Sequence, residues 1–274
     1  MRVTPLRPRS PALAPFISSM GYLEGEFPHG RERVLPSGTV QLLVNLDRDA
    51  LHSAPDGLPP IRTGGAALQG PSARPALVDT ADQRAILWVE FRPGGAAPFF
   101  PGPAEACDQL VPLDAVWGRR GPALRERLLA AGSPEEMRAA VEAALLAAAE
   151  PPRPDPALTA AVAALHRGAT VADTADRLGW TTKRLARLFS AHVGLAPKRF
   201  ARIRRFQRLL SAAAARGEGD WARLAAECGY HDQAHMIHDF RAFAGQSPTE
   251  YSPRSAEERN HVPFLQGDDG TAAA

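Results

Sequence analysis

An internal repeat in the C-terminal third constrains the fold of this chain more than any other feature. The segment VADTADRLGW, residues 171–180, aligns with WARLAAECGY, residues 221–230, at a displacement of 50 residues. The matched pairs are Ala175 with Ala225, Gly179 with Gly229 and, displaced by one residue more, Phe189 with Phe240. Two copies of one local pattern at a nearly fixed spacing predict two copies of one supersecondary unit.

Each copy has the composition of a helix-turn-helix unit. A short helix carries a small residue, Ala175 or Ala225, that lets its partner helix approach closely, and a glycine then permits the left-handed turn that ends the helix. The second helix of each copy keeps apolar residues on one side, and these are Leu185, Leu188 and Phe189 in the first copy and Met236, Ile237 and Phe240 in the second. One such match would also fit an ordinary helical hairpin, but two in register favour a tandem DNA-binding unit.

The segment between the copies, residues 198–210, predicts a basic connecting helix with an apolar stripe. Its cations are Lys198, Arg199, Arg202, Arg204, Arg205 and Arg208. Residues 157–252 carry 14 basic and 8 acidic side chains, whereas residues 1–156 carry 16 and 18. Because nucleic-acid binding depends on where cations cluster, this block favours DNA as partner, with a solvated basic face as the alternative.

The C-terminal residues also carry a family resemblance. The stretch GWTTKRLARLFSAHVGLAPKRFARIRRFQRLL, followed by CGYHDQAHMIHDFRAFAGQSPTEY, resembles the DNA-binding domain of the AraC/XylS family of transcription regulators. The resemblance implies about seven helices, in which two recognition helices joined by a long linker helix enter successive major-groove segments.

Position by position, the resemblance implies three groups of DNA-binding residues. The first recognition helix would present Thr182, Lys183, Arg184 and Arg187, with Ala186 beside them. The linker helix would direct Lys198, Arg199, Arg202 and Arg205 to phosphates. The second recognition helix would present His231, Gln233, His235 and His238, with Ala234. His238 stands where the family usually has arginine, which predicts weaker or pH-sensitive binding by the second unit.

The whole chain is expected to be an α+β protein of two domains. Residues 1–150 predict a small antiparallel β-barrel or sandwich with flanking helices, and a proline-rich linker follows at 151–157. The DNA-binding domain would cover residues 158–252, and residues 253–274 are expected to be a disordered tail because they are polar. Strands are expected at 33–35, 40–46, 66–69, 75–79 and 86–92. Helices are expected after Gly121 and after Ser133, which can cap the second of them.

The N-terminal domain resembles, more loosely, the sensor-like domain of other family members. If residues 86–92 form a strand, alternation places Trp88 and Glu90 on one face, where they would line an effector pocket, and Val89 and Phe91 on the other. An ordinary core is the alternative reading of these residues. An effector-independent DNA-binding adaptor would instead need a filled interior.

An enzyme is the rival of a different class, and we expect none. His231, His235 and His238 have the spacing of a metal site, but no carboxylate or cysteine stands at a helpful distance along the chain. Cys107 alone cannot supply thiol chemistry, and Cys228 occupies the position of Leu178 in the repeat.

The partners expected from the sequence are double-stranded DNA, a small-molecule effector, RNA polymerase and a second copy of the chain. No cofactor is expected, and no stretch has the length of a membrane span. The low cysteine content fits the cytoplasm. The sequence leaves open the effector, the operator, the oligomeric state, and whether transcription is activated or repressed.

Overall fold

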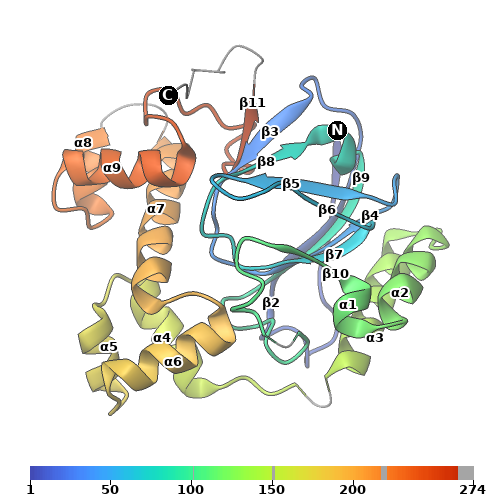
Figure 1. Cartoon of the computed structure of the whole chain (residues 1–274), viewed down its shortest axis with the longest axis horizontal. Coiled ribbons are helices and arrows are strands. Elements are labelled where there is room, and N and C mark those ends of the chain that lie inside the picture. Colours follow the sequence, from blue (N-terminus) through green and yellow to red (C-terminus); the bar gives the residue numbers. More distant parts are fainter. Residues whose placement is uncertain (101, 150–151, 217–220, 265–274) are drawn as a thin grey trace.

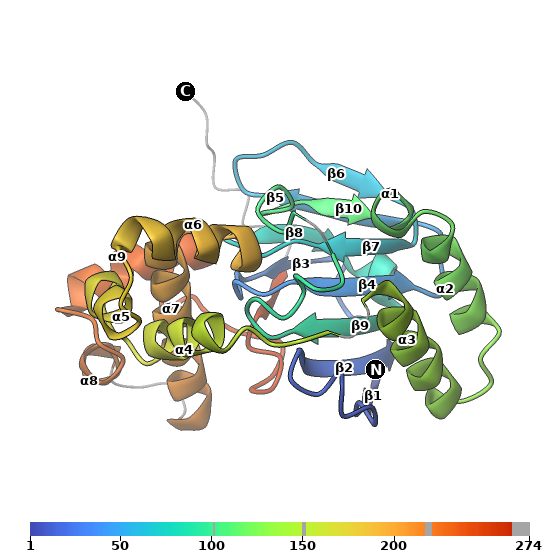
Figure 2. The ribbon, with the colours of Figure 1, turned by 90° about the horizontal axis from the view of Figure 1, so that it is seen from below.

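The computed structural model describes residues 1–100, 102–149, 152–216 and 221–264, and Figures 1 and 2 show a sheet-rich N-terminal part beside a helical C-terminal part. The six-stranded sheet has the order β1 (Arg2–Leu6), β2 (Ile17–Glu24), β9 (Ala85–Phe91), β4 (Gln41–Asn45), β7 (Ala66–Gln69) and β10 (Leu110–Pro112). The five-stranded sheet has the order β11 (His261–Phe264), β3 (Arg31–Val34), β8 (Ala76–Asp79), β5 (Leu51–Pro55) and β6 (Ile61–Thr63). The predicted α+β class with a small sheet-rich N-terminal domain is confirmed.

The strands predicted from the sequence are present, and the structure contains further strands that were not predicted. The predictions at 40–46, 66–69 and 86–92 coincide with β4, β7 and β9, whose apolar runs are bounded by turns. β2 was missed because Gly21 interrupts its pattern and a register shift between Ile17 and Ser19 breaks the alternation of apolar and polar residues. Such a shift moves later side chains to the opposite face, so period-two patterning fails locally.

Three helices cover one end of the sheets, as Figure 1 shows: α1 (Leu113–Trp117), α2 (Arg120–Leu129) and α3 (Pro134–Ala148). The predicted cap of α3 is confirmed, since the Ser133 hydroxyl accepts from the Glu136 backbone N–H at 3.2 Å. Residues 152–155, in the segment predicted as the linker, contain no helix or strand, and Pro151 lies outside the described residues. A turn of 3-10 helix, η1 (Thr80–Gln83), connects β8 to β9.

The repeat corresponds to two helix-turn-helix units joined by one long helix. The helices are α4 (Pro156–His166), α5 (Val171–Arg177), α6 (Thr182–Val193), α7 (Pro197–Arg216), α8 (Trp221–Glu227) and α9 (Gln233–Ala244). Gly179 and Gly229 have φ of +64° and +82°, the left-handed conformation that the turns require. The described residues thus give this domain six helices instead of about seven, because the chain after Gly245 forms only a turn.

The linker helix α7 packs against both units, which lie at its two ends in Figure 1. Its fully buried side chains include Ile203, Phe206 and Leu209. The Phe206 ring meets the Phe240 ring of α9 at 5.3 Å between centroids. Aromatic packing therefore holds the second recognition helix, α9, against α7.

A buried carboxylate adds a polar anchor to this packing. Asp239 of α9 is 1% exposed, and Arg202 Nη2 lies 2.6 Å from its Oδ1. Arg205 Nη2 lies 3.3 Å from Oδ2. Because a buried carboxylate requires compensating partners, the two α7 arginines fix the rotation of α9 about its own axis.

The expectation of a disordered tail from residue 253 is wrong for residues up to 264. Residues 261–264 form β11, which pairs antiparallel with β3 from His261 opposite Val34 to Phe264 opposite Arg31. Disorder was expected because the segment is polar. Composition could not show that it pairs with a strand more than 200 residues away along the chain. Residues 265–274 of the predicted tail lie outside the described residues. None of the described helices has the length and apolar character needed to cross a membrane.

Replacing Asp239 by alanine should destabilise the protein strongly, because Arg202 and Arg205 would lose their shared carboxylate. We expect the free energy of unfolding to fall by about 3 kcal/mol, measured by urea denaturation. The matched control is Asp176→Ala, which removes an exposed carboxylate from α5 and should change the stability by less than about 0.5 kcal/mol. Equal stability of the two variants would contradict the anchoring role of Asp239.

Candidate nucleic-acid interface and interdomain cavity

The first recognition helix, α6, exposes the predicted polar residues on one side. The Thr181 hydroxyl caps its start by accepting from the Arg184 backbone N–H at 3.1 Å. Leu185, Phe189 and Val193 are buried against the rest of the domain. The exposed residues of its first turns are Thr182, Lys183, Arg184 and Arg187, with Ala186 half-buried. This surface combines hydroxyl donors with cations, the groups that read base edges and neutralise phosphates.

The second recognition helix, α9, is capped by Asp232, which accepts from the His235 backbone N–H at 2.7 Å. His231, Gln233, Ala234 and His238 are exposed, and His235 is half-buried. The His235 ring lies 5.2 Å from the Tyr230 ring, and its Nε2 is 3.3 Å from Arg205 Nη2. His235 therefore packs against Arg205 of α7 and against Tyr230 in the turn before α9, whereas the other four residues are exposed.

The cations of α7 do not form one common surface. Lys198 is exposed, but Arg199 donates to the Ala73 carbonyl of the N-terminal domain and lies over the Phe243 ring at 4.9 Å. Arg202 and Arg205 pair with Asp239. Arg199, predicted to contact a phosphate, makes a contact between the domains in this structure. For Arg202 and Arg205, the structure provides a partner within the protein that the sequence did not indicate.

Arg204, also on α7, joins the domains through its buried guanidinium. Its Nη1 donates to the Ser37 carbonyl at 3.2 Å, and its Nε donates to His166 Nδ1 at 3.1 Å. Burial lowers the pKa of Arg204, and burial together with the Arg204 charge lowers the pKa of His166. A neutral His166 can accept this hydrogen bond, so the two pKa shifts are consistent with the geometry.

A cavity of about 1080 Å³ extends from the space between the two sheets to the boundary between the domains. From the N-terminal domain it is lined by Trp88, Glu90 and Thr39, and from the helical domain by His166 and Arg204. The predicted alternation along β9 is confirmed, because Val89 and Phe91 point instead into the core of the N-terminal domain. That helical-domain residues share this cavity was not predicted from the sequence.

The Glu90 carboxylate, which lines this cavity, accepts hydrogen bonds from three neighbouring hydroxyl groups. The Ser18 and Ser19 hydroxyls each donate to its Oε2 at 3.1 Å, and the Thr39 hydroxyl donates to its Oε1 at 2.9 Å. The Trp88 ring lies over Gly21, where an added Cβ would come within 2.4 Å of the ring. Gly21 thus leaves room for the indole beside this carboxylate.

Chemistry of another kind would need metal-binding or nucleophilic side chains. Among the described residues, no group of three or more histidine, cysteine, aspartate and glutamate side chains could hold a metal ion. Burial, reinforced by the charge of Asp108, raises the pKa of Cys107 to about 12. Its thiol is therefore protonated and unreactive at neutral pH.

Comparison with known proteins divides the chain in the same way. Residues 159–254 match a family model described as a helix-turn-helix domain, and residues 6–112 match a domain of unknown function, DUF6597. Over 36 residues the chain is 50% identical to the HTH-type transcriptional regulator GadX of Escherichia coli O6:H1, and equally to GadX of E. coli O127:H6. The chain spans only 13% of the length of these curated relatives, and the alignment covers 13% of this chain.

Solved structures of ToxT from Vibrio cholerae are similar over both domains, at low sequence identity. One ToxT structure covers 85% of this chain and 96% of its own, with a TM-score of 0.47 and 11% identity. A ToxT structure with bound unsaturated fatty acid covers 85% and 92%, with a TM-score of 0.46 and 10% identity. With its tandem units, its exposed recognition helices and the matching family model, the region from residue 159 to residue 254 is a helix-turn-helix domain of the AraC type.

Proposed function

We propose that this chain is a sequence-specific DNA-binding transcription regulator whose N-terminal domain binds a small-molecule effector. The observation that carries the proposal is the placement of α6 and α9 at the two ends of α7. A helix of 20 residues is about 30 Å long, close to one turn of B-DNA. Both recognition helices could therefore enter successive major-groove segments on one face of the duplex.

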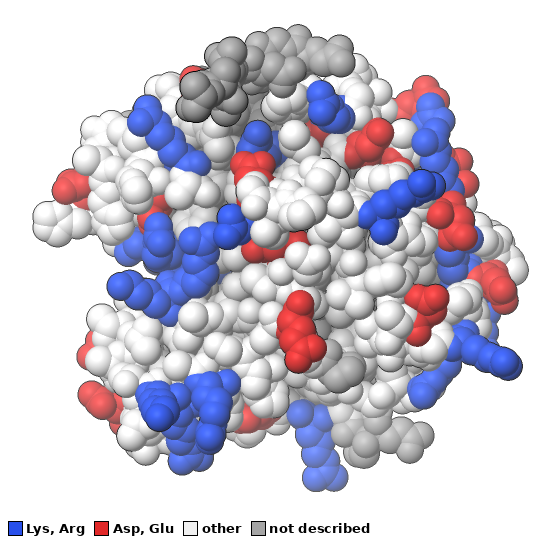
Figure 3. Space-filling model, viewed as in Figure 1, with Lys and Arg blue, Asp and Glu red and all other residues white. Residues whose placement is uncertain are grey.

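The exposed residues supply the chemistry for reading DNA. In the first unit, Lys183 and Arg187 can bind guanine edges or phosphates, and Thr182 can donate to either. In the second unit, Gln233 suits an adenine edge, while His238 offers a shorter side chain than the usual arginine. Figure 3 supports this assignment, because Lys and Arg side chains gather over the region of α6. We therefore propose that the first unit contributes more to affinity.

The cavity supports a sensory role for the N-terminal domain. Effector sites are concave and mostly apolar, with a few convergent polar groups, and here Glu90, Thr39 and Trp88 meet such a description. An effector-independent adaptor would need a filled interior, so the open cavity favours the effector. RNA polymerase and a second copy of the chain are further partners in this proposal, and the cytoplasm is its location.

Replacing Arg187 by alanine should weaken binding to the DNA upstream of the protein's own and neighbouring genes. Because a base or phosphate contact would be lost, we expect at least a tenfold higher dissociation constant and a smaller salt dependence, measured by fluorescence anisotropy across a salt titration. His238→Ala should cause a smaller loss, of about threefold, because the second unit contributes less.

The matched control is Arg127→Ala, which removes an exposed arginine from α2 at the far end of the sheets. It should leave the affinity unchanged, since α2 lies far from both recognition helices. The proposal fails if Arg127→Ala and Arg187→Ala weaken DNA binding equally, or if the wild-type protein prefers no upstream fragment over random duplex.

The cavity should bind the fluorescent probe anilinonaphthalene sulfonate, which has an apolar aromatic part and a sulfonate anion, at a single saturable site. Because Trp88 lies in the cavity wall, energy transfer to the probe should quench its emission, and Trp88→Phe should remove most of that quenching. Trp180→Phe is the control, since Trp180 lies in the turn before α6. Binding without saturation, or equal quenching in both variants, would contradict an accessible cavity at Trp88.

A further inference from the structure

The C-terminal residues 253–264, here called the C-terminal strap, return from the helix-turn-helix domain to the N-terminal domain. Their strand β11 extends the five-stranded sheet by pairing with β3, and the Leu35 backbone N–H donates to the Asn260 carbonyl at 2.8 Å. At the end of the strand, the Arg31 guanidinium lies over the Phe264 ring at 5.2 Å. The strap is therefore an added edge strand that originates in the other domain.

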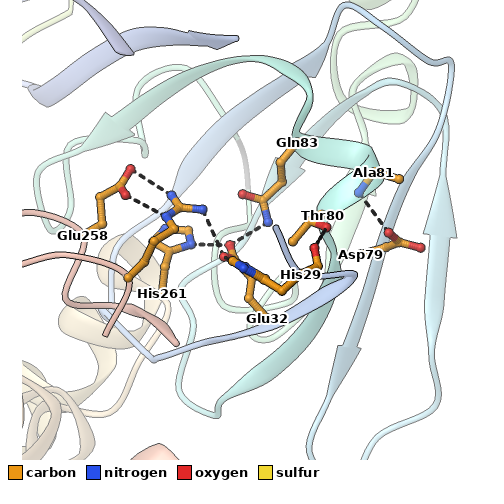
Figure 4. Close-up of polar contacts among 9 residues, drawn as sticks. His29, Glu32, Asp79, Thr80, Ala81, Gln83, Glu258 and His261 are labelled. Carbon is orange, nitrogen blue, oxygen red and sulfur yellow. Dashed lines mark hydrogen bonds and ion pairs between the residues drawn. The ribbon is translucent and has the colours of Figure 1, made fainter. Parts of the chain in front are cut away.

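The strap is held by the carboxylate of Glu32 in β3, which is 0% exposed (Figure 4). His261 Nδ1 lies 2.6 Å from its Oε1, and Gln83 Nε2 donates to the same oxygen at 2.7 Å. Arg254 Nη1 lies 3.0 Å from Oε2, and His29 Nε2 lies 3.3 Å from it. Two residues of the strap thus share one buried charge of the N-terminal domain.

The electrostatics of this group favour the docked strap. Burial by itself opposes the charge of Glu32, but the hydrogen bond and charge of His261, followed by Arg254 and Gln83, lower its pKa to about 2. Glu32 is therefore ionised throughout the physiological range. Gln83 and His29 of the N-terminal domain provide part of the compensation for this buried charge, and the strap adds the Arg254 guanidinium and the His261 ring.

The strap also reaches the linker helix. Gln207 of α7 donates through Nε2 to Asn260 Oδ1 at 2.9 Å and to the Pro36 carbonyl at 2.8 Å. Val262 of the strap belongs to the hydrophobic core of the helical domain, together with Leu35 and Ala73 of the N-terminal domain. The strap, α7 and the N-terminal domain are therefore joined by a shared hydrophobic core and by the two hydrogen bonds of the Gln207 amide.

In this arrangement, two half-buried cations of α7 are engaged by the N-terminal domain. Arg199 and Arg204 donate to the Ala73 and Ser37 carbonyls of the N-terminal domain, and burial lowers the pKa of both. A guanidinium engaged in this way has fewer donors left, and less freedom to move, for contacts with DNA phosphates. Release of Arg199 and Arg204 would add up to two phosphate contacts to the DNA-binding domain.

We infer that the C-terminal strap is an autoinhibitory lock that uses Glu32 to hold α7 against the N-terminal domain and to keep Arg199 and Arg204 from DNA. The strap residues Arg254, Glu258 and His261 line the same cavity as Glu90 and Arg204, so a ligand in the cavity would contact the lock directly. The inference rests on the proposed function and gives the mechanism of its regulation.

The lock is tested first by trypsin, because the strap contains cleavage sites at Arg254 and Arg259, and the site at Arg259 is present in every variant used. Glu32→Gln and Arg254→Met should each release the strap and accelerate cleavage after Arg259 at least tenfold. The matched control is Glu26→Gln, which removes the same charge as Glu32→Gln from a side chain that is 82% exposed. Circular dichroism establishes that each variant is folded. Unchanged cleavage in folded Glu32→Gln and Arg254→Met would overturn the lock.

DNA binding tests the autoinhibition separately. Both strap variants should bind duplex DNA at least threefold more tightly than wild type, with a salt slope steeper by up to about 2, because each freed phosphate contact adds about 0.9. Arg254→Met is the sharper variant, since the loss of a positive charge by itself would weaken binding. Glu26→Gln should leave both quantities unchanged.

The outcomes separate this inference from the proposed function. Faster cleavage without tighter DNA binding would overturn the autoinhibition. If wild type prefers no upstream fragment over random duplex, the proposed function fails. Binding to the random duplex would then still report whether the strap variants release Arg199 and Arg204.

Discussion

Burial of the linker helix α7 is the constraint on which the other features of this structure depend. Phe200 and Phe206 are completely buried, and their rings contact Phe189 of the first unit and Phe240 of the second. The same hydrophobic core includes Leu35 and other residues contributed by the N-terminal domain. A shift of α7 would therefore disturb both recognition helices and the domain boundary together, because close-packed cores transmit displacement.

The arginines of α7 illustrate how burial decides the role of a cation. A guanidinium removed from water needs hydrogen-bond acceptors. The arginines of α7 use two kinds of acceptor, a side-chain carboxylate and backbone carbonyls. Arg202 and Arg205 share the carboxylate of Asp239, which orients α9. Arg199 and Arg204 use backbone carbonyls across the domain boundary, so the linker helix connects the proposed sensor to the proposed DNA surface.

Sequence reasoning succeeded where the determining interactions are local. The predicted cap Ser133 acts within three residues, and the left-handed turns at Gly179 and Gly229 depend on one residue each. It failed for the strap, because His261 and Glu32 meet 229 residues apart along the chain. Polarity suggested disorder there, although the polar side chains have buried partners.

The sequence by itself determined that two helix-turn-helix units exist, that Ser133 caps a helix of the first domain, and which face of each recognition helix is apolar. Helical periodicity and capping encode these properties within a few residues. Only the tertiary structure decided that Arg199 and Arg204 face the N-terminal domain, that Trp88 and Glu90 share a cavity with α7, and that the C-terminal strap closes on Glu32. These features depend on contacts between distant segments, and neither periodicity nor composition encodes which segments will meet.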